Sequence, residues 1–474
     1  MPINMLKDKL SFLKPSFIST LVIIGILFYS QMNIKPWKNA EKQHSLIDWD
    51  VTSYYAYLPA YFIHDDLTLS FTDNDSINYS AKHQFWPEKA PNGGKVIKTT
   101  MGLSFLYAPF FMMGHLFASS TSQYAANGFS KPYEFFLGLS SIFYLMIGLY
   151  YLRKVLLKFF NEAITSVTIV SLVMGTNLYY YCTTEPCMSH AYNFSLISVF
   201  MYFVIKWFDA QKLKYAIALG VTGGLIVLIR PVNLLVFIFP LLYHSFNIAK
   251  TARIFAQFWR HILVIAMLVF MTVCPQLIYW KYITGNWIFN SYVGEQFYFN
   301  KPHILEFLFS YRSGWMVYSP IMIFSLTGFL FLYKTKKNFF YALLIPLGIN
   351  IYVLSCWWCW WYGGSYGMRS IIDFYPFLSI PFAASIAWMY KRNHVIKFLS
   401  GSLIVCLISL NLFQTLQRRH NIIHWDSMTK EAFWANFGKN SMTASDWEAF
   451  NSQIQKPDYK QAKMGIDEYE FQPF

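Results

Sequence analysis

The chain has 474 residues, of which 55% are hydrophobic, 20% aromatic and only 13% charged. A soluble domain carries about twice that share of charged residues, and the apolar residues here gather into long runs, so a soluble fold is excluded. The formal net charge of +14 does not indicate nucleic-acid binding, because the excess lies in short loops between apolar runs, where it sets membrane orientation.

Eleven apolar runs are long enough to cross a membrane if short and tilted spans are allowed. The predicted spans are 16–33, 133–152, 163–181, 190–208, 214–230, 232–247, 261–281, 315–333, 338–357, 371–390 and 396–413. The first run follows Lys7, Lys9 and Lys14 without a small-residue cleavage site after it, which favours a retained anchor over a signal peptide. The sequence therefore predicts an all-α, polytopic helical bundle, with a transmembrane domain over residues 1–414 and a short tail over 415–474.

The stretch Met101–Ala118 is not counted as a span, because Pro109 and His115 interrupt it and a crossing there would invert every later loop. Without it, the short loops on the amino-terminal side are all basic, as expected for cytoplasmic loops. The long first outer loop, residues 34–132, then carries this stretch as an interfacial or re-entrant helix. These features predict a multi-pass protein with a cytoplasmic amino terminus and a carboxyl terminus on the outer side.

Ionisable and aromatic residues from five distant parts of the chain are predicted to share the outer side. They are Asp48, Asp50, Tyr54, Tyr55, Glu185, His190, Arg230, Glu295, Arg312, Trp361 and Arg369. Because ionisable groups at membrane depth are costly, a converging set predicts a functional site. A carboxylate can accept the proton of an attacking hydroxyl, arginines can bind a phosphate leaving group, and aromatic rings can stack on a sugar.

Structural interpretations of the same residues stay open at the level of sequence. The acids after the first span can be solvated groups at a helix start, and Arg230 can be a cation that reaches from a span end to the membrane surface. Glu185 can pair with His190, and Arg369 can pair with Asp373, four residues later on one helix face. The shared outer location of the whole set favours the functional interpretation.

Four motifs carry a resemblance to a known family. They are Asp50-x3-Tyr54-Tyr55-Ala56-Tyr57-Leu58-Pro59, Glu185-Pro186-x-Met188-Ser189-His190, Arg230-Pro231-x-Asn233 and Trp361-x-Gly363-Gly364-x-x-Gly367-x-Arg369. With the layout of the first 414 residues, they resemble the GT-C superfamily of integral membrane glycosyltransferases, which use polyprenyl-phosphate-linked sugars. The resemblance implies that Asp50, or Asp48 as second choice, is the catalytic base. The second acid usual in the first outer loop has no sure match, and Asp65 and Asp66 are the candidates.

The resemblance further implies an inverting transfer of a hexosyl or pentosyl group at the periplasmic face of a bacterial inner membrane. The donor phosphate is expected to be bound by Arg369, with Arg312 or Arg230. The sugar or the acceptor is expected to be positioned by Tyr54, Tyr55, Glu185, His190, Glu295 and Trp361. The acceptor is a glycan, a lipid or a protein. No cofactor is certain; a divalent metal is possible, although no three-ligand cluster in the sequence requires one.

A transporter or flippase of a lipid-linked sugar is the alternative function. Such proteins place polar residues near the middle of the membrane and often contain paired, inverted halves with broken helices. Here the predicted spans are apolar at their centres, and only the break at Arg230-Pro231 favours transport. The sequence therefore favours an enzyme.

Overall fold

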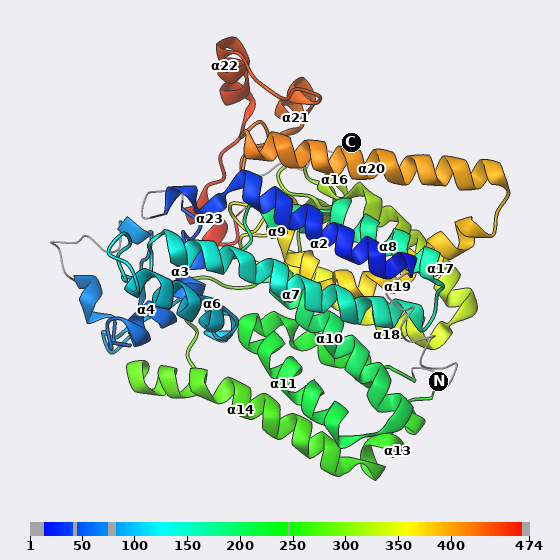
Figure 1. The fold of residues 1–474 in the computed structure, drawn as a ribbon, viewed down its shortest axis with the longest axis horizontal. Coiled ribbons are helices and arrows are strands. Elements are labelled where there is room, and N and C mark those ends of the chain that lie inside the picture. Colours follow the sequence, from blue (N-terminus) through cyan, green and yellow to red (C-terminus); the bar gives the residue numbers. More distant parts are fainter. Residues whose placement is uncertain (1–13, 41–44, 74–81, 245–246, 467–474) are drawn as a thin grey trace.

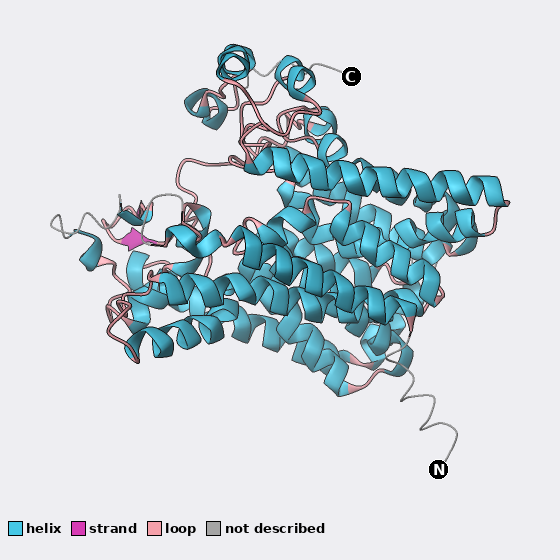
Figure 2. Ribbon diagram, turned by 45° about the horizontal axis from the view of Figure 1, so that its top comes forward, coloured by secondary structure: helices cyan, strands magenta, loops and turns pink. Residues whose placement is uncertain are grey.

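The computed structural model describes residues 14–40, 45–73, 82–244 and 247–466, so Lys7 and Lys9 lie outside the described residues. The described chain is mainly helical, and its helices lie side by side in one bundle (Figure 1). One short antiparallel hairpin, β1 (Glu88–Lys89) with β2 (Lys95–Val96), lies in the first long loop (Figure 2). The predicted class, a helical membrane bundle, is confirmed.

Seven helices of the described residues are long and apolar enough to cross a membrane. They are α2 (Pro15–Ile34), α7 (Lys131–Leu157), α10 (Ser189–Ala210), α14 (Trp259–Thr284), α18 (Lys337–Ser355), α19 (Tyr375–Tyr390) with the preceding 3-10 helix η6 (Arg369–Phe374), and α20 (His394–Arg419). Only 11% of the most apolar stretch of α14 or of α20 is buried inside the protein. Such wide apolar faces are stable against lipid rather than water, so the chain is a polytopic helical membrane protein.

The other four predicted spans coincide with shorter apolar helices. These are α8 (Glu162–Met174), α11 (Leu213–Ile229), the 3-10 helix η4 (Pro231–Phe237) with α12 (Ile238–Leu241), and the 3-10 helix η5 (Pro320–Met322) with α17 (Ile323–Thr335). The helical backbone is interrupted just before Pro231 and Pro320, which begin η4 and η5. Proline causes these interruptions, because the residue before a proline avoids helical backbone. Arg230 is accordingly extended, with φ −144° and ψ 104°. The eleven-span topology stays a prediction.

Successive helices alternate in direction, so their connections gather at two ends of the bundle (Figure 1). The end that carries α3 (Asp50–Tyr55), α4 (Tyr57–Phe62) and α6 (Gly102–Ser119) is called the loop end below. The same end holds η2 (Pro36–Asn39), η3 (Ser70–Asp73), α9 (Leu178–Thr183), α15 (Ile304–Phe309) and α16 (Trp315–Tyr318). The opposite end, with the start of α2 and with α13 (Ile248–Gln257), is called the short-loop end.

The helix predicted over Met101–Ala118 is present as α6, which continues through Pro109 in its interior. Proline is tolerated inside a membrane helix when neighbouring groups satisfy the backbone around it. Here the Tyr144 hydroxyl of α7 donates to the carbonyl of Leu106, one turn before the proline, at 3.0 Å. α6 is not one of the seven long apolar helices, so its exclusion from the spans is not contradicted.

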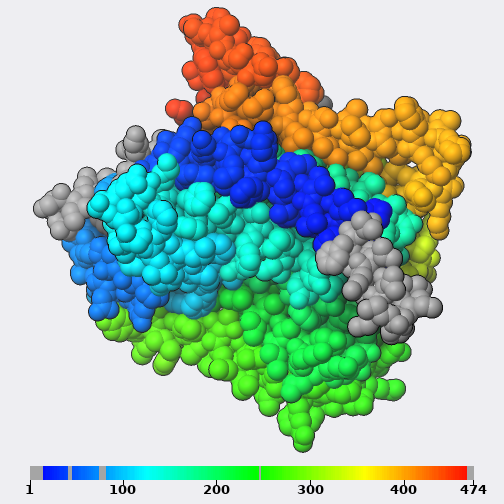
Figure 3. Space-filling model, in the orientation of Figure 1, coloured from blue at the N-terminus to red at the C-terminus, as the bar shows by residue number. Residues whose placement is uncertain are grey.

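Small residues let the helices approach closely. An added Cβ at Gly328 of α17 would lie 1.8 Å from the carbonyl oxygen of Pro381 in α19, so only glycine fits this crossing. The carboxyl-terminal helices α21 (Lys430–Asn436) and α22 (Ala444–Gln453) stand out from the bundle beside the end of α20 (Figures 1 and 3). The short helix α23 (Tyr459–Lys463) returns to the loop end, where the Tyr459 ring packs on Trp361 at 5.7 Å.

Candidate functional site

An ion pair between residues 319 positions apart lies at the loop end. Arg369 Nη2 donates to Asp50 Oδ2 at 2.8 Å and to the carbonyl of Tyr362 at 2.7 Å. The Asp50 side chain is 53% exposed, whereas the Arg369 side chain is only 12% exposed. The structure therefore holds one carboxylate by a buried guanidinium while leaving it open to water.

The backbone before Asp50 places this carboxylate. Trp49 has a φ of +47°, which is unusual for a residue with a side chain and is found mainly where surrounding structure imposes it. The Asp48 carboxylate accepts a hydrogen bond from the Trp49 amide at 2.9 Å. Asp50 then begins α3, where the helix dipole favours an acid. Asp48 thus supports the turn, and Asp50 forms the ion pair with Arg369.

Arg369 also controls the charge of Asp50. Burial raises the pKa of the Asp50 carboxyl and is the largest single effect, but the charge and hydrogen bond of Arg369, together with the charges of Lys98 and His190, outweigh it. The net pKa lies below the ordinary value of 3.8, so Asp50 is a carboxylate at neutral pH.

A second carboxylate, Asp373 in η6, is fully buried and is surrounded by hydrogen-bond donors. The donors are Asn233 Nδ2 at 2.7 Å, Asn193 Nδ2 at 3.1 Å, Arg230 Nη1 at 3.1 Å and His190 Nδ1 at 3.2 Å. They come from α10 and from the break between α11 and η4. Four donors compensate the cost of burying this charge, so Asp373 is the centre of a connected polar network.

The network fixes the orientation of the His190 ring. Because an ionised carboxylate can only accept, the hydrogen bond to Asp373 Oδ1 requires the hydrogen on His190 Nδ1, so in the neutral ring Nε2 keeps its lone pair. Nε2 is buried and has no hydrogen-bond partner among the described residues. His190 can therefore accept one further hydrogen bond, from a group that enters the site.

The broken helix positions Arg230 near the membrane surface. The 17 residues of α11 span about 26 Å from the short-loop end, close to the roughly 30 Å of a bilayer's hydrocarbon core. Arg230 turns inward to Asp373 with its side chain only 14% exposed. The interpretation of Arg230 as a cation reaching out to the membrane surface is therefore wrong.

Two sequence-based ion pairs are also wrong. Arg369 and Asp373 do not pair, because η6 is a 3-10 helix in which residues three apart, not four, share a face. Glu185 does not pair with His190; it accepts from the Tyr180 hydroxyl at 2.6 Å and lies 3.9 Å from Arg418 Nη2. In each case the acid pairs with a base from another part of the chain.

The remaining predicted residues lie around this centre in supporting contacts. Glu295 is paired with Lys98 at 2.5 Å and accepts from Trp358 at 3.1 Å. Arg312 is buried, donates to the carbonyl of Gln455 at 3.2 Å and lies 5.0 Å from the centroid of Trp361. The structure thus links the first predicted outer loop, the segments before the predicted eighth and tenth spans, and the tail.

The two predicted tyrosines are buried beside Asp50. Tyr54 is 8% exposed and its carbonyl accepts from the hydroxyl of Ser104, while the fully buried Tyr55 donates to the carbonyl of Gly128. Both contacts anchor α3 on neighbouring segments of the first long loop. Asp65 makes no contact with the network among those described, and Asp66 caps its own turn by accepting from Thr68 and Ser70.

Sequence reasoning missed Asn193, Asn233 and Arg418 as site residues and named Asp373 only as a pairing partner. Asn193 lies three residues after His190 on one face of an apolar helix, a signal that the sequence does contain. Asn233 is part of the quoted Arg230 motif. Arg418 falls in the predicted tail, shortly after the last predicted span, and has no distinguishing signal.

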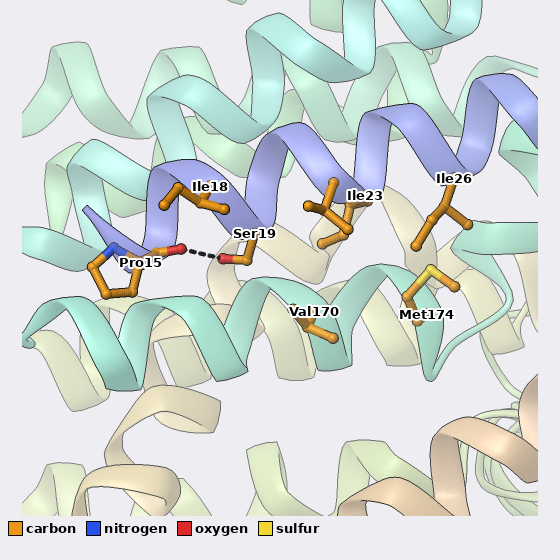
Figure 4. A pocket seen from close by; sticks show the side chains of 8 residues that line it. Pro15, Ile18, Ser19, Ile23, Ile26, Val170 and Met174 are labelled. Carbon is orange, nitrogen blue, oxygen red and sulfur yellow. Dashed lines mark hydrogen bonds between the residues drawn. The ribbon is translucent and has the colours of Figure 1, made fainter. Parts of the chain in front are cut away.

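No group of three or more His, Cys, Asp or Glu residues in the described part of the chain is arranged to hold a metal ion. The acids of the site face cations and amides instead. Two hollows in the protein also lie elsewhere. One, of about 500 Å³, is an apolar groove between α2 and α8 (Figure 4). The other, of about 380 Å³, lies at the short-loop end beside Lys336 and Lys337.

Neither a protein-family model nor a curated protein matches this sequence.

Proposed function

We propose that the protein is an inverting glycosyltransferase of the GT-C type that uses a polyprenyl-phosphate-linked sugar. The observation that carries the proposal is the exposed Asp50 carboxylate, held by Arg369 beside the buried network of Arg230, His190 and Asp373. These groups lie at one end of a membrane bundle, where a lipid phosphate and a polar acceptor can meet.

In the proposed reaction the acceptor oxygen attacks the anomeric carbon of the donor sugar. Asp50 takes the hydroxyl proton as the new carbon–oxygen bond forms. The bond from the anomeric carbon to the phosphate oxygen breaks on the opposite face, and its electron pair leaves with the polyprenyl phosphate. Arg369 and Arg230 bind this anion through paired donors. One displacement inverts the anomeric configuration.

The ion pair gives this reaction an order. A donor phosphate that binds Arg369 competes with Asp50 for the same guanidinium. Since Arg369 lowers the pKa of Asp50, its transfer to the phosphate makes the carboxylate a stronger base. The base is then most active when the donor is bound.

His190 and the outer residues serve to position the substrates in this proposal. His190 Nε2 accepts a hydrogen bond from a sugar hydroxyl, because no described residue already occupies it. Glu185, Glu295 and the Trp361 region, together with Tyr54 and Tyr55, shape the surroundings of the sugar and the acceptor. Arg312 is assigned to hold Trp361 and the tail.

The test of the function is sugar transfer by the purified protein from a radiolabelled prenyl-phosphate donor to an added acceptor fraction. The expected result is labelled glycan together with released prenyl phosphate. The absence of transfer with every prenyl-phosphate sugar offered would overturn the proposal.

The proposed orientation places the loop end in the periplasm of a bacterial inner membrane and the short loops in the cytoplasm. Cys406 is the exposed cysteine of the chain and is first replaced by serine. Asp50→Cys and Lys336→Cys variants are then treated with a membrane-impermeant thiol reagent in intact cells. Position 50 is expected to react and position 336 is not, and the reverse result would invert the topology.

A flippase of lipid-linked sugars is the second candidate, and one observation favours it. The break at Arg230 and the 3-10 helices η4 and η6 meet at the buried Asp373, as unwound helices do at transporter sites. Proteoliposomes separate the two functions. A flippase moves a fluorescent prenyl-phosphate sugar across the bilayer without breaking it, whereas the transferase consumes the donor on one side.

A further inference from the structure

Arg418 is a buried guanidinium without a close protein ligand. It lies in the last turn of α20 and is 8% exposed. Its Nε has no hydrogen-bond partner in the part of the chain that the structure describes. The nearest carboxylate oxygen, Glu185 Oε1, lies 3.9 Å from Nη2, beyond hydrogen-bond distance.

Arg369 and Arg230, the arginines of the proposed donor site, are bound differently. Arg369 has an oxygen of Asp50 at 2.8 Å, and Arg230 has an oxygen of Asp373 at 3.1 Å. Charged hydrogen bonds to guanidinium groups are normally about 2.7–2.9 Å long. Arg418 has only the long pairing with Glu185 at 3.9 Å, so an incoming anion would displace a weaker contact there than at Arg369 or Arg230.

Burial without such contacts is energetically unfavourable, so the site is built for something other than stability. A buried charge needs hydrogen bonds or a counter-ion to offset its lost hydration. Tyr180 provides only a ring, whose centroid is 5.8 Å from the guanidinium carbon. Glu185 is one-third exposed and already accepts from the Tyr180 hydroxyl, so it compensates Arg418 only in part.

The position of Arg418 connects it to the proposed active centre. The rings of Tyr180 and Tyr181 are 5.1 Å apart, and the Tyr181 ring is 5.1 Å from His190. A chain of ring contacts through Tyr180 and Tyr181 thus connects Arg418 to His190 of the Asp373 network.

We propose that Arg418 forms a second phosphate-binding subsite of this centre. The phosphate class follows from the planar fork of guanidinium donors at a membrane surface. The role of the bound phosphate in catalysis rests on the proposed function, but the existence of the subsite does not. A lipid phosphate and inorganic phosphate share this chemistry, and the experiment separates them.

The experiment measures thermal unfolding of the full-length protein in detergent, alone and with farnesyl phosphate or inorganic phosphate. Arg418→Gln is compared with Arg419→Gln, which removes the same charge from an exposed neighbour. Without ligand, Arg418→Gln is expected to be at least as stable as the wild type. Its apparent phosphate affinity is expected to fall at least ~10-fold, while Arg419→Gln behaves as the wild type.

A shift that Arg418→Gln reduces supports the subsite. If both compounds cause that shift, the site binds phosphate in general; if farnesyl phosphate alone causes it, the site binds a lipid headgroup. An Arg418→Gln protein that is less stable without ligand and keeps the full phosphate shift would overturn it, since Arg418 would then be a structural partner of Glu185.

Two further variants keep the test decisive. Glu185→Gln removes the nearest negative charge and should strengthen phosphate binding, even if Arg418→Gln fails to fold; unchanged or weaker binding contradicts the subsite. Arg369→Gln separates the two proposals. If it alone abolishes the phosphate shift, the Arg418 subsite is wrong and the proposed donor site stands. If Arg418→Gln alone abolishes the phosphate shift and the wild-type protein transfers no sugar, the subsite stands and the proposed function fails.

Discussion

The two ends of the bundle use charge in opposite ways. At the short-loop end, Arg153 pairs with Glu162 nine residues later at 3.1 Å, and Lys158 pairs with Asp209 at 2.6 Å with both side chains more than a third exposed. The first pair connects α7 to α8 with the Arg153 side chain only 11% exposed, and the second connects the end of α7 to α10 near water. The exposed second pair is an inexpensive contact that holds these helix ends in place.

At the loop end, the pairs join remote segments and include a fully buried acid. Asp50 meets Arg369 across 319 residues, and Arg230 meets Asp373 across 143. A buried ion pair repays its desolvation poorly compared with apolar packing, so stability alone does not explain such a network. The difference supports the proposal that the loop end, rather than the short-loop end, carries the functional site.

The largest expected effect comes from Asp373→Asn, which leaves Arg230 and His190 around a neutral amide. The free energy of unfolding should fall by about 3–5 kcal/mol, because a buried cation loses its counter-ion. Chemical unfolding in detergent, followed by tryptophan fluorescence, measures the change. Adding Arg230→Gln should recover part of the lost stability. A loss below about 1 kcal/mol in the single variant would mean that the network contributes no more stability than the exposed ion pair of the short-loop end.

The next effect is catalytic. Asp50→Asn should lower sugar transfer by at least ~10²-fold, since a positioned proton acceptor is lost. Asp48→Asn should have a much smaller effect, because Asp48 supports the Trp49 turn. Initial rates of radiolabelled transfer measure both, with Asp209→Asn as a control. If the combined replacement of Asp48 and Asp50 left the rate unchanged, the proposed mechanism would be wrong.

A smaller effect concerns pH. Arg369 helps to hold the pKa of Asp50 below its ordinary value of 3.8. The carboxylate should therefore stay ionised and active at a lower pH than an ordinary aspartate. Arg369→Gln removes this effect and should move the acid limb of the rate profile to higher pH, besides weakening donor binding. The profile of donor kcat/KM against pH measures the limb. Arg392→Gln, an exposed arginine at the short-loop end, should leave it in place.

The smallest effect belongs to the short-loop end. Asp209→Asn breaks an exposed pair with Lys158 and should change the free energy of unfolding by at most about 1 kcal/mol. Raised salt should reduce even this difference, because water and ions screen the pair. A loss as large as that of Asp373→Asn, under the same unfolding conditions, would remove the contrast between the two ends.

Local sequence determined the class of this protein and much of its layout. Long apolar runs and basic short loops require a helical membrane bundle, since only helices satisfy the backbone of such runs in lipid. The break at Arg230-Pro231 was also readable, because a residue before proline leaves the helical region. The sequence also identified most of the acids, arginines and aromatic residues that the structure gathers at the loop end.

Only the tertiary structure decided which of these groups meet. Spacing suggested that Arg369 pairs with Asp373, yet the 3-10 geometry of η6 turns Arg369 toward Asp50 and leaves Asp373 to Arg230 and His190. Arg418 acquires its burial from the packing of α20 beside α9 and the tail. Contacts between residues hundreds of positions apart depend on how whole helices pack, and no local pattern of residues encodes that arrangement.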